Sequence, residues 1–120
     1  MNKNRLSSVR IRETQKALSG KCTWALDSYT RMVGLLNHSS LPTDESLLIE
    51  PCKQVHTFFM RFAIDVVFLS SSNQVLKISS MKPWRLSPLV WNAKRVLELP
   101  VGSCSDAGLT EGAHLEFSDA

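Results

Sequence analysis

The chain is organised around one strongly apolar stretch, residues 52–69, which reads CKQVHTFFMRFAIDVVFL. Residues 55–60 and 64–69 are rich in β-branched and aromatic side chains, a composition typical of strands. Successive side chains of a strand point to opposite faces, so both faces of 64–69 are apolar apart from Asp65. We therefore expect this strand to lie at the centre of the core, covered on both sides.

A β-hairpin is predicted directly after this stretch. Residues 70–73, Ser-Ser-Ser-Asn, are typical of a turn, and apolar positions recur in residues 74–79. The sequence also predicts short strands at residues 8–14, 21–26, 46–49, 95–99 and 114–117, and one helical turn at residues 103–108. Many short strands separated by turns predict a mainly β fold, a small β-sandwich or barrel.

One α-helix of ordinary length is expected at residues 28–36, where an Asp-Ser pair can cap the first turn. Its buried stripe would be formed by Met32, Leu35 and Leu36, which lie at helical spacing. Residues 81–92 contain two prolines and two tryptophans without any periodicity, which is typical of a long loop. Loops of this length usually carry function or cover part of the core.

Length and composition predict one cytoplasmic domain over residues 1–120, with residues 1–6 disordered and the protein a monomer. The 43% hydrophobic content excludes global disorder. No apolar run approaches the ~18 residues of a membrane span, and no apolar segment of a signal peptide follows the basic N-terminus. Three widely spaced cysteines fit a reducing compartment better than a disulfide scaffold.

Positive charge is concentrated near the N-terminus. Up to Lys21 the chain has six basic residues and one acid, Glu13, which gives this region a charge of +5 within a total of +3. Such an arm could contact nucleic acid or an acidic partner. Because no aromatic residue is interleaved with these charges, a solvated terminus is the favoured interpretation. A nucleic-acid-associated protein therefore remains an alternative, and nucleic acid is not the expected partner.

Three parts of the sequence resemble the signatures of a known family. They are YTRMVGL (29–35), HTFFM with IDVVF (56–60 and 64–68), and VLELPVG with GLTEG (96–102 and 108–112). Together, and in this order, they resemble the domain of unknown function 192 family from about residue 18 onward. The resemblance implies a small all-β sandwich of jelly-roll type with one helix. It implies no catalytic residue, because the family has no established activity.

Cys52, His56 and Asp65 are the residues that an enzyme could use. Cys52 and His56 would be roughly 13 Å apart on an extended strand, too far to share one metal ion, so no metal or cofactor is expected. The three could act as nucleophile, base and orienting group. No glycine-rich elbow or oxyanion turn follows Cys52. A small hydrolase-like or metal-dependent enzyme is therefore an alternative to the principal interpretation.

The principal interpretation is a binding module for a small ligand or a protein. Residues 82–91, KPWRLSPLVW, combine cationic and aromatic groups that could bind an acidic or aromatic ligand, a peptide or single-stranded nucleic acid. Alternatively, both tryptophans close the end of the core. We expect a concave site between the helix, the central strand and this loop. The candidate ligand-binding residues are Arg31, His56, Arg61, Asp65, Trp84 and Arg85.

Asp65 needs partners, because burying an ionised carboxylate is unfavourable unless it is paired or accepts hydrogen bonds. Three sources of such partners are possible from the sequence. Arg61 lies four residues earlier in the chain, Arg31 could reach the carboxylate from the helix, and a bend at residues 62–63 could supply main-chain N–H groups.

Overall fold

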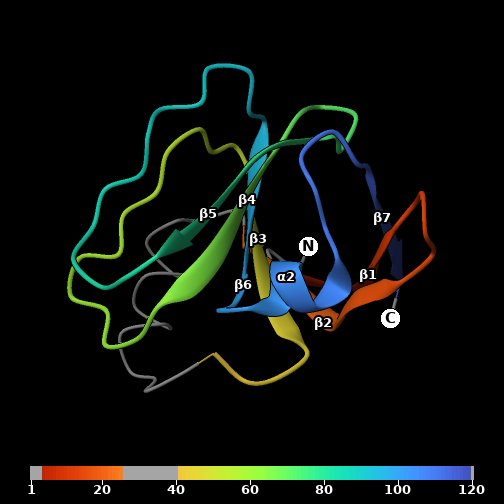
Figure 1. Ribbon diagram of the computed structural model, residues 1–120, viewed down its shortest axis with the longest axis horizontal. Helices are drawn as coiled ribbons and strands as arrows, with labels where there is room; N and C mark the ends of the chain where they lie inside the picture. The colour runs from red at the N-terminus through yellow and green to blue at the C-terminus, as the bar shows by residue number, and fades with distance from the viewer. Residues whose placement is uncertain (1–3, 26–40, 120) are drawn as a thin grey trace.

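The computed structural model describes residues 4–25 and 41–119 of the chain. Seven strands form one curled sheet with the shape of a half-barrel, in the order β5-β4-β6-β3-β2-β1-β7 (Figure 1). They are β1 (Asn4–Ile11), β2 (Ala17–Ala25), β3 (Glu45–Ile49), β4 (Ile64–Leu69), β5 (Val75–Met81), β6 (Arg95–Pro100) and β7 (Leu115–Asp119), and helix α2 (Ser103–Ala107) follows β6. The predicted mainly β class is confirmed. The helix predicted at residues 28–36 lies outside the described residues.

β4 is the central strand that the apolar stretch predicts. It spans Ile64–Leu69, as predicted, and all six of its residues are buried. It pairs antiparallel with β5 on one side and with β6 on the other, so the predicted hairpin is confirmed. Alternate side chains of β4 enter two hydrophobic clusters, one on each face of the sheet.

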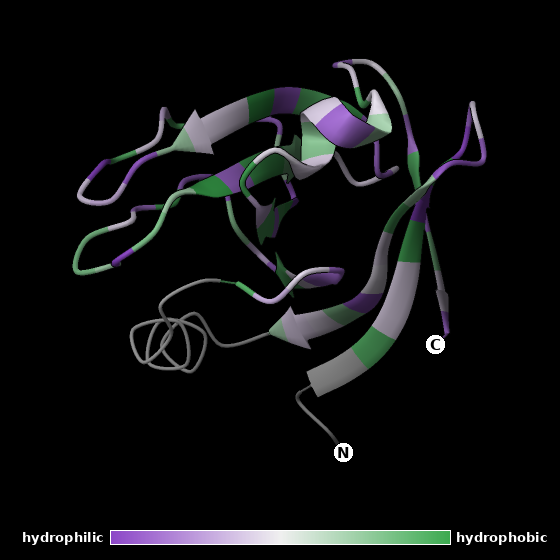
Figure 2. Cartoon of the chain, turned by 60° about the horizontal axis from the view of Figure 1, so that its bottom comes forward, coloured by the Kyte–Doolittle hydropathy of each residue, from purple (hydrophilic) through white to green (hydrophobic). Residues whose placement is uncertain are grey.

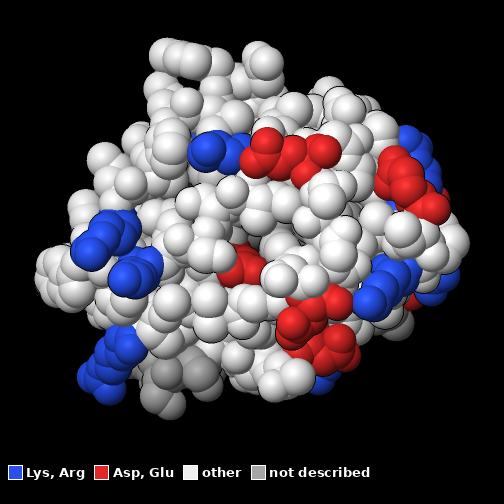
Figure 3. All heavy atoms as spheres, viewed as in Figure 1, with Lys and Arg blue, Asp and Glu red and all other residues white. Residues whose placement is uncertain are grey.

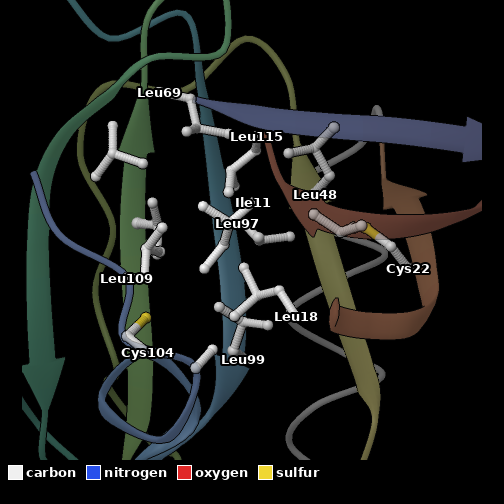
Figure 4. Packing of buried hydrophobic residues seen from close by; sticks show 14 residues of the cluster. Ile11, Leu18, Cys22, Leu48, Leu69, Leu97, Leu99, Cys104, Leu109 and Leu115 are labelled. Atoms are coloured by element: carbon white, nitrogen blue, oxygen red, sulfur yellow. The ribbon is translucent and has the colours of Figure 1, made fainter. Parts of the chain in front are cut away.

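The inner core fills the inside of the curled sheet, where side chains from all seven strands and α2 point toward one another (Figure 4). β4 contributes Val67 and Leu69 to it. Its members are Val9, Ile11, Leu18, Cys22, Leu48, Val67, Leu69, Val75, Leu97, Leu99, Cys104, Ala107, Leu109 and Leu115. Complete burial of a Val or Leu side chain contributes roughly 1.5–3 kcal/mol, so this core is a main source of stability.

The outer core lies on the opposite face of β4 and β6. Its members are Val55, Met60, Ile64, Val66, Phe68, Met81, Ala93 and Val96. Residues 51–63 and 82–94, neither of which contains a strand, supply three of these side chains and lie over this face. Figure 2 shows hydrophobic and hydrophilic residues mixed along the strand that follows the N-terminus. In this strand, β1, Val9 and Ile11 pack on the inner core, whereas Arg10 between them is exposed.

The two end strands of the sheet, β5 and β7, lie close to each other at their first residues. Val75 donates its main-chain N–H to Ala113 O at 2.7 Å, and Gly112 donates its N–H to Val75 O at 2.8 Å. Gln74 and His114 form an isolated antiparallel bridge beside them. The curl of the sheet therefore closes at this corner, through contacts between segments that are far apart in the sequence.

Helix α2 packs on the inner core with Cys104 and Ala107, and it confirms the predicted helical turn at 103–108. Gly102 (φ 92°) and Gly108 (φ 69°) flank it in left-handed conformations, where glycine has the least strain. Within residues 4–25 and 41–119, no helix is long and apolar enough to cross a membrane.

The strand predicted at residues 55–60 is wrong. Thr57 forms hydrogen bonds with residues 82–85 instead of joining a neighbouring strand. Phe59 has φ 67°, a left-handed conformation that a regular strand does not contain. Strand composition alone does not form a strand when the chain finds no partner in the sheet, so only the second part of the 52–69 stretch is extended.

β1 begins at Asn4, inside the stretch that we expected to be disordered. It pairs with β2 on one side and with β7 on the other, from Asn4↔Ala25 to Ile11↔Leu115. Main-chain hydrogen bonds to β2 and β7 hold this strand in place. Such bonds do not depend on side-chain type, so the sequence of residues 4–7 shows no strand pattern. The basic N-terminal region from Asn4 onward is therefore part of the sheet and not a free arm.

Glu13, in the turn between β1 and β2, connects this turn to β7. Its Oε1 accepts the main-chain N–H of His114 at 2.9 Å, and its Oε2 lies 2.8 Å from His114 Nδ1. The main-chain hydrogen bond, followed by the side-chain hydrogen bond, lowers the pKa of Glu13 from 4.5 to about 2. Since the pKa is lower in the folded protein, this contact stabilises the fold above about pH 4.5 and loses its effect as the pH falls toward 2.

We expect the Glu13 carboxyl to titrate near pH 2 in an NMR titration of the native protein. His114→Ala keeps the main-chain bond and removes the ring contact, so it should raise this midpoint only part of the way toward 4.5. A wild-type midpoint near 4.5 would show that the contact between the turn and β7 is not formed in solution.

Candidate functional site

Thr57 fastens the two segments that cover the outer core to each other. It donates its N–H to Arg85 O at 2.8 Å and accepts the N–H of Trp84 at 2.9 Å through its carbonyl. Its hydroxyl donates to Lys82 O at 2.6 Å and accepts the N–H of Arg85 at 2.9 Å. The side chain is fully buried, and His56 and Leu86 form an isolated bridge beside it. The buried Thr57 therefore links the two segments, together with bonds from Ser87 N–H to Val55 O and from Val90 N–H to Lys53 O, both at 2.9 Å.

Four aromatic rings lie in succession across this junction, and we call them the aromatic cluster. His56 stacks on Phe58 at 4.7 Å between ring centroids, Phe58 lies 6.3 Å from Trp84, and Trp84 lies 4.6 Å from Phe59. Phe59 and Trp84 are 63% and 56% exposed. Both have left-handed backbones, φ 67° and 64°, a conformation of order 1–3 kcal/mol less favourable for residues with a side chain. The fold thus holds two large rings at the surface in strained conformations.

Basic residues lie close in the sequence to the rings of the aromatic cluster. Arg61, Lys82 and Arg85 are exposed, and residues 51–64 and 82–94 contain no Asp or Glu. In Figure 3 the Lys and Arg side chains at the left of the molecule have no acidic neighbour, and this is the side on which these segments lie in Figure 1. We define the aromatic–basic surface as Phe59, Trp84, Leu86, Arg61, Lys82 and Arg85.

Two hollows lie between β5 and the segment that carries Trp84. The first has a volume of about 380 Å³ and is lined by Ser79, Ser80, Met81, Lys82, Arg85, Leu86, Ser87 and Pro88. The second has a volume of about 510 Å³ and is lined by Leu76, Lys77, Pro88, Leu89, Val90, Trp91, Asn92 and Glu111. The first hollow shares three residues with the aromatic–basic surface and extends it toward the sheet.

Asp65 lies on the inner face of β4, with Val67 and Leu69, and is 2% exposed. Its Oδ2 accepts the main-chain N–H groups of Gly102 at 3.1 Å and Cys104 at 3.0 Å, and its Oδ1 accepts the Ser80 hydroxyl at 2.8 Å. Asp65 was expected to pair with Arg61 or with main-chain N–H groups of residues 62–63, and it forms these three hydrogen bonds instead. Asp65 therefore holds the start of α2 against the sheet.

The structure brings together His56, Trp84 and Arg85 among the six predicted ligand-binding residues. His56 and Trp84 belong to the aromatic cluster, and Arg85 bonds to Thr57 beside it. Arg61 is exposed on the same loop as Phe59. Asp65 is buried on the other face of the sheet, and Arg31 lies outside the described residues. The expected concave site stays a prediction, because the helix that would form one of its walls lies outside the described residues.

Cys52 and Asp65, which the enzyme alternative requires together, lie on opposite faces of β4. Cys52 packs against the outer core and donates its thiol to Gln54 O at 3.2 Å, whereas Asp65 faces α2. The described ranges contain no group of three or more His, Cys, Asp and Glu side chains that could hold a metal ion. This geometry offers no support for a Cys52, His56 and Asp65 triad.

The other two thiols are poor nucleophiles. Burial raises the pKa of Cys22 to about 11. Burial, and to a smaller extent the Asp65 carboxylate, raise the pKa of Cys104 to about 12. Both thiols are therefore protonated at neutral pH and pack as small apolar groups.

Two buried polar residues of this region were not among the predicted site residues. The role of Thr57 could not be predicted from the sequence, because threonine is common in strands and the residues on both sides of it also have strand composition. Glu98 on β6 is fully buried and pairs with Val66 of β4 and Leu47 of β3. It points to the outer core, as Val96 does. The sequence did contain a signal for the burial of Glu98, because this residue is an acid inside the apolar run 96–99.

The fold and the site define a small half-barrel β protein with an aromatic–basic surface beside its outer core. The family model described as Uncharacterized ACR, the domain of unknown function 192 family, matches residues 9–117. The chain belongs to this family, as the sequence signatures predicted.

Relatives with similar sequences agree with this assignment. A UPF0127 protein of Pyrococcus furiosus is 39% identical over 64 residues, 53% of this chain and 55% of its own length. A UPF0127 protein of Pyrococcus abyssi is 44% identical over 48 residues, 40% of this chain and 41% of its own length. The matched part thus spans about half of each relative.

Two crystal structures share the fold. The first, from Sinorhizobium meliloti, is described provisionally as a transcription regulator; it has a TM-score of 0.74 and 20% identity, covering 98% of this chain and 97% of its own. The second, a protein of unknown function from Novosphingobium aromaticivorans, has a TM-score of 0.72 and 19% identity, covering 92% of this chain and 84% of its own. At these identities the likeness shows the fold alone.

Proposed function

We propose that this protein is a binding module that recognises a partner protein through the aromatic–basic surface. One observation carries the proposal: Phe59 and Trp84 are in ring contact, largely exposed, and both held in left-handed backbone conformations. Exposed apolar surface and local backbone strain each oppose stability, and both concentrate at sites of recognition. Thr57 and the hydrogen bonds that it makes keep these conformations in place.

The chemistry of the surface indicates the chemistry of the partner. Trp and Arg are the side chains that most often dominate the binding energy of protein interfaces. The two segments that form the surface contain basic residues and no acid. A partner with apolar groups and negative charge would complement both features, and the charges would speed its association.

The two alternatives have less support from the geometry. An enzyme based on Cys52, His56 and Asp65 would need groups that lie on opposite faces of the sheet. A nucleic-acid-associated protein would use the basic N-terminal region, which from Asn4 onward is a paired strand. The description of the Sinorhizobium structure as a transcription regulator does not carry over, because only the fold is shared. A cytoplasmic, monomeric setting stays a prediction.

The test is a selection of random dodecapeptides on phage against the wild-type protein. We expect enrichment of peptides that combine Asp or Glu with apolar residues. Fluorescence anisotropy with the enriched peptides should show binding at least about tenfold weaker for Trp84→Ala, because truncating a central aromatic residue removes most of its contact.

Leu6→Ala is the matched control, because Leu6 is a large apolar side chain, 45% exposed, on β1 and outside this surface. It should bind the peptides as the wild type does, and circular dichroism should show that both variants stay folded. Peptides whose binding is unchanged in both Trp84→Ala and Phe59→Ala would refute the proposal.

A further inference from the structure

The two hollows adjoin at Pro88 beside β5, and together we call them the trough. Pro88 lines both, and the β5 side of the trough runs from Leu76 to Lys82. At about 3.3 Å per residue this distance is roughly 20 Å, the length of about six residues of extended chain. The opposite wall carries three exposed apolar side chains: Leu86 at 60%, Leu89 at 42% and Trp91 at 74%.

β5 is an end strand, so its outer edge has no strand partner in the described part of the chain. Val75 N–H bonds to Ala113 O, and Ile78 N–H donates to Glu111 Oε2 at 3.1 Å. The pairing of β4 with β5 shifts register between Val75 and Lys77 and is regular from Lys77 onward. Because alternate residues of a regular strand direct their main-chain groups to the same side, Ser80, two residues after Ile78, also presents its N–H and C=O outward. The second half of β5 therefore offers main-chain groups to another strand.

The charges of the trough favour an acidic occupant. Lys77, Lys82 and Arg85 line it. Glu111 is the one acid among the lining residues, and its carboxylate already accepts a hydrogen bond from Ile78. An occupant with carboxylates near the three basic groups and apolar side chains toward the opposite wall would complement the trough.

We infer that the trough binds an extended, acidic segment of the partner protein, which adds to the outer edge of β5 as a further strand. Strand addition uses main-chain hydrogen bonds for affinity and pockets for alternate side chains for specificity. Both features are present beside β5. This inference rests on the proposed function and names the kind of partner that the same surface receives.

The test uses the tightest dodecapeptide from the phage selection, unmodified or N-methylated at alternate amides in either register. N-methylation removes the N–H donors of one edge of the peptide and leaves its side chains unchanged. We expect at least about tenfold weaker binding for one register and little change for the other. In NMR hydrogen exchange, the Ser80 amide should become protected when peptide binds, while the amides of β7, the other end strand, stay unchanged.

Two lysine variants test the charge argument. Lys77→Gln, inside the trough, should weaken binding about two- to fivefold, and added salt should reduce the difference. Lys21→Gln makes the same change at an exposed position of β2, outside the trough, and should leave binding unchanged.

Three outcomes would overturn the inference. If both methylated registers bind like the unmodified peptide while Trp84→Ala still weakens binding, strand addition is wrong and the proposed function stands. If no peptide is enriched, the proposed function falls and this inference falls with it. If oligo-dT displaces the peptide and depends on Lys77, the trough is assigned to single-stranded nucleic acid.

Discussion

Asp65→Ala is expected to lower the free energy of unfolding by about 3–5 kcal/mol. The substitution removes the acceptor for the N–H groups of Gly102 and Cys104 and for the hydroxyl of Ser80. An N–H group left buried without a partner destabilises a protein by about 1–3 kcal/mol. Since a domain of this size has a total stability of about 5–15 kcal/mol, urea unfolding followed by circular dichroism should show a large shift of the midpoint.

Two further variants separate this role from a role in binding. Asp65→Asn keeps the size of the side chain and one acceptor oxygen, so it should destabilise less, by about 1–2 kcal/mol. Asp106→Ala removes an exposed acid from the same helix and should change stability by no more than about 0.5 kcal/mol. If both Asp65 variants unfold within about 0.5 kcal/mol of wild type, the anchoring role fails and Asp65 becomes a candidate site residue.

Thr57→Val should have the second large effect, on stability and on binding together. Valine has the shape of threonine but leaves Lys82 O without its donor and Arg85 N–H without its acceptor. We expect a loss of about 2–4 kcal/mol in the free energy of unfolding. Because these bonds position the segment that carries Trp84, peptide binding should also weaken, by at least about tenfold.

Thr57→Ser is the matched control, since it keeps the hydroxyl and loses one methyl group. It should destabilise by about 1 kcal/mol or less and should bind peptide nearly as the wild type does. Peptide binding by Thr57→Val at wild-type strength, measured by fluorescence anisotropy, would show that Thr57 does not position the surface.

Much of the fold can be predicted from local patterns. β4 has the predicted bounds, because a short continuous apolar run rich in β-branched residues and followed by a polar turn is typical of a strand that is covered on both faces. The β4–β5 hairpin and the short helix α2 follow from turn residues close by in the sequence. The family signatures likewise depend on residue order and are confirmed over residues 9–117.

The errors arise where long-range pairing decides the local conformation. Residues 55–60 have strand composition, but Thr57 bonds to a segment about 25 residues away, as in its 2.6 Å contact with Lys82. β1 begins at Asn4 because β2 and β7 lie on both sides of it. Neither partner can be identified from the residues of the strand itself.

The sequence by itself determined the mainly β class, the central strand and the residue types available for recognition, because these depend on side-chain chemistry and periodicity. The tertiary structure alone decided which of these side chains meet. The pairing of β4 with β5 brings Ser80 to Asp65, and the paths of two loops bring Trp84 to Phe59. Contacts of this kind depend on the paths of two chain segments in space, which no local pattern encodes.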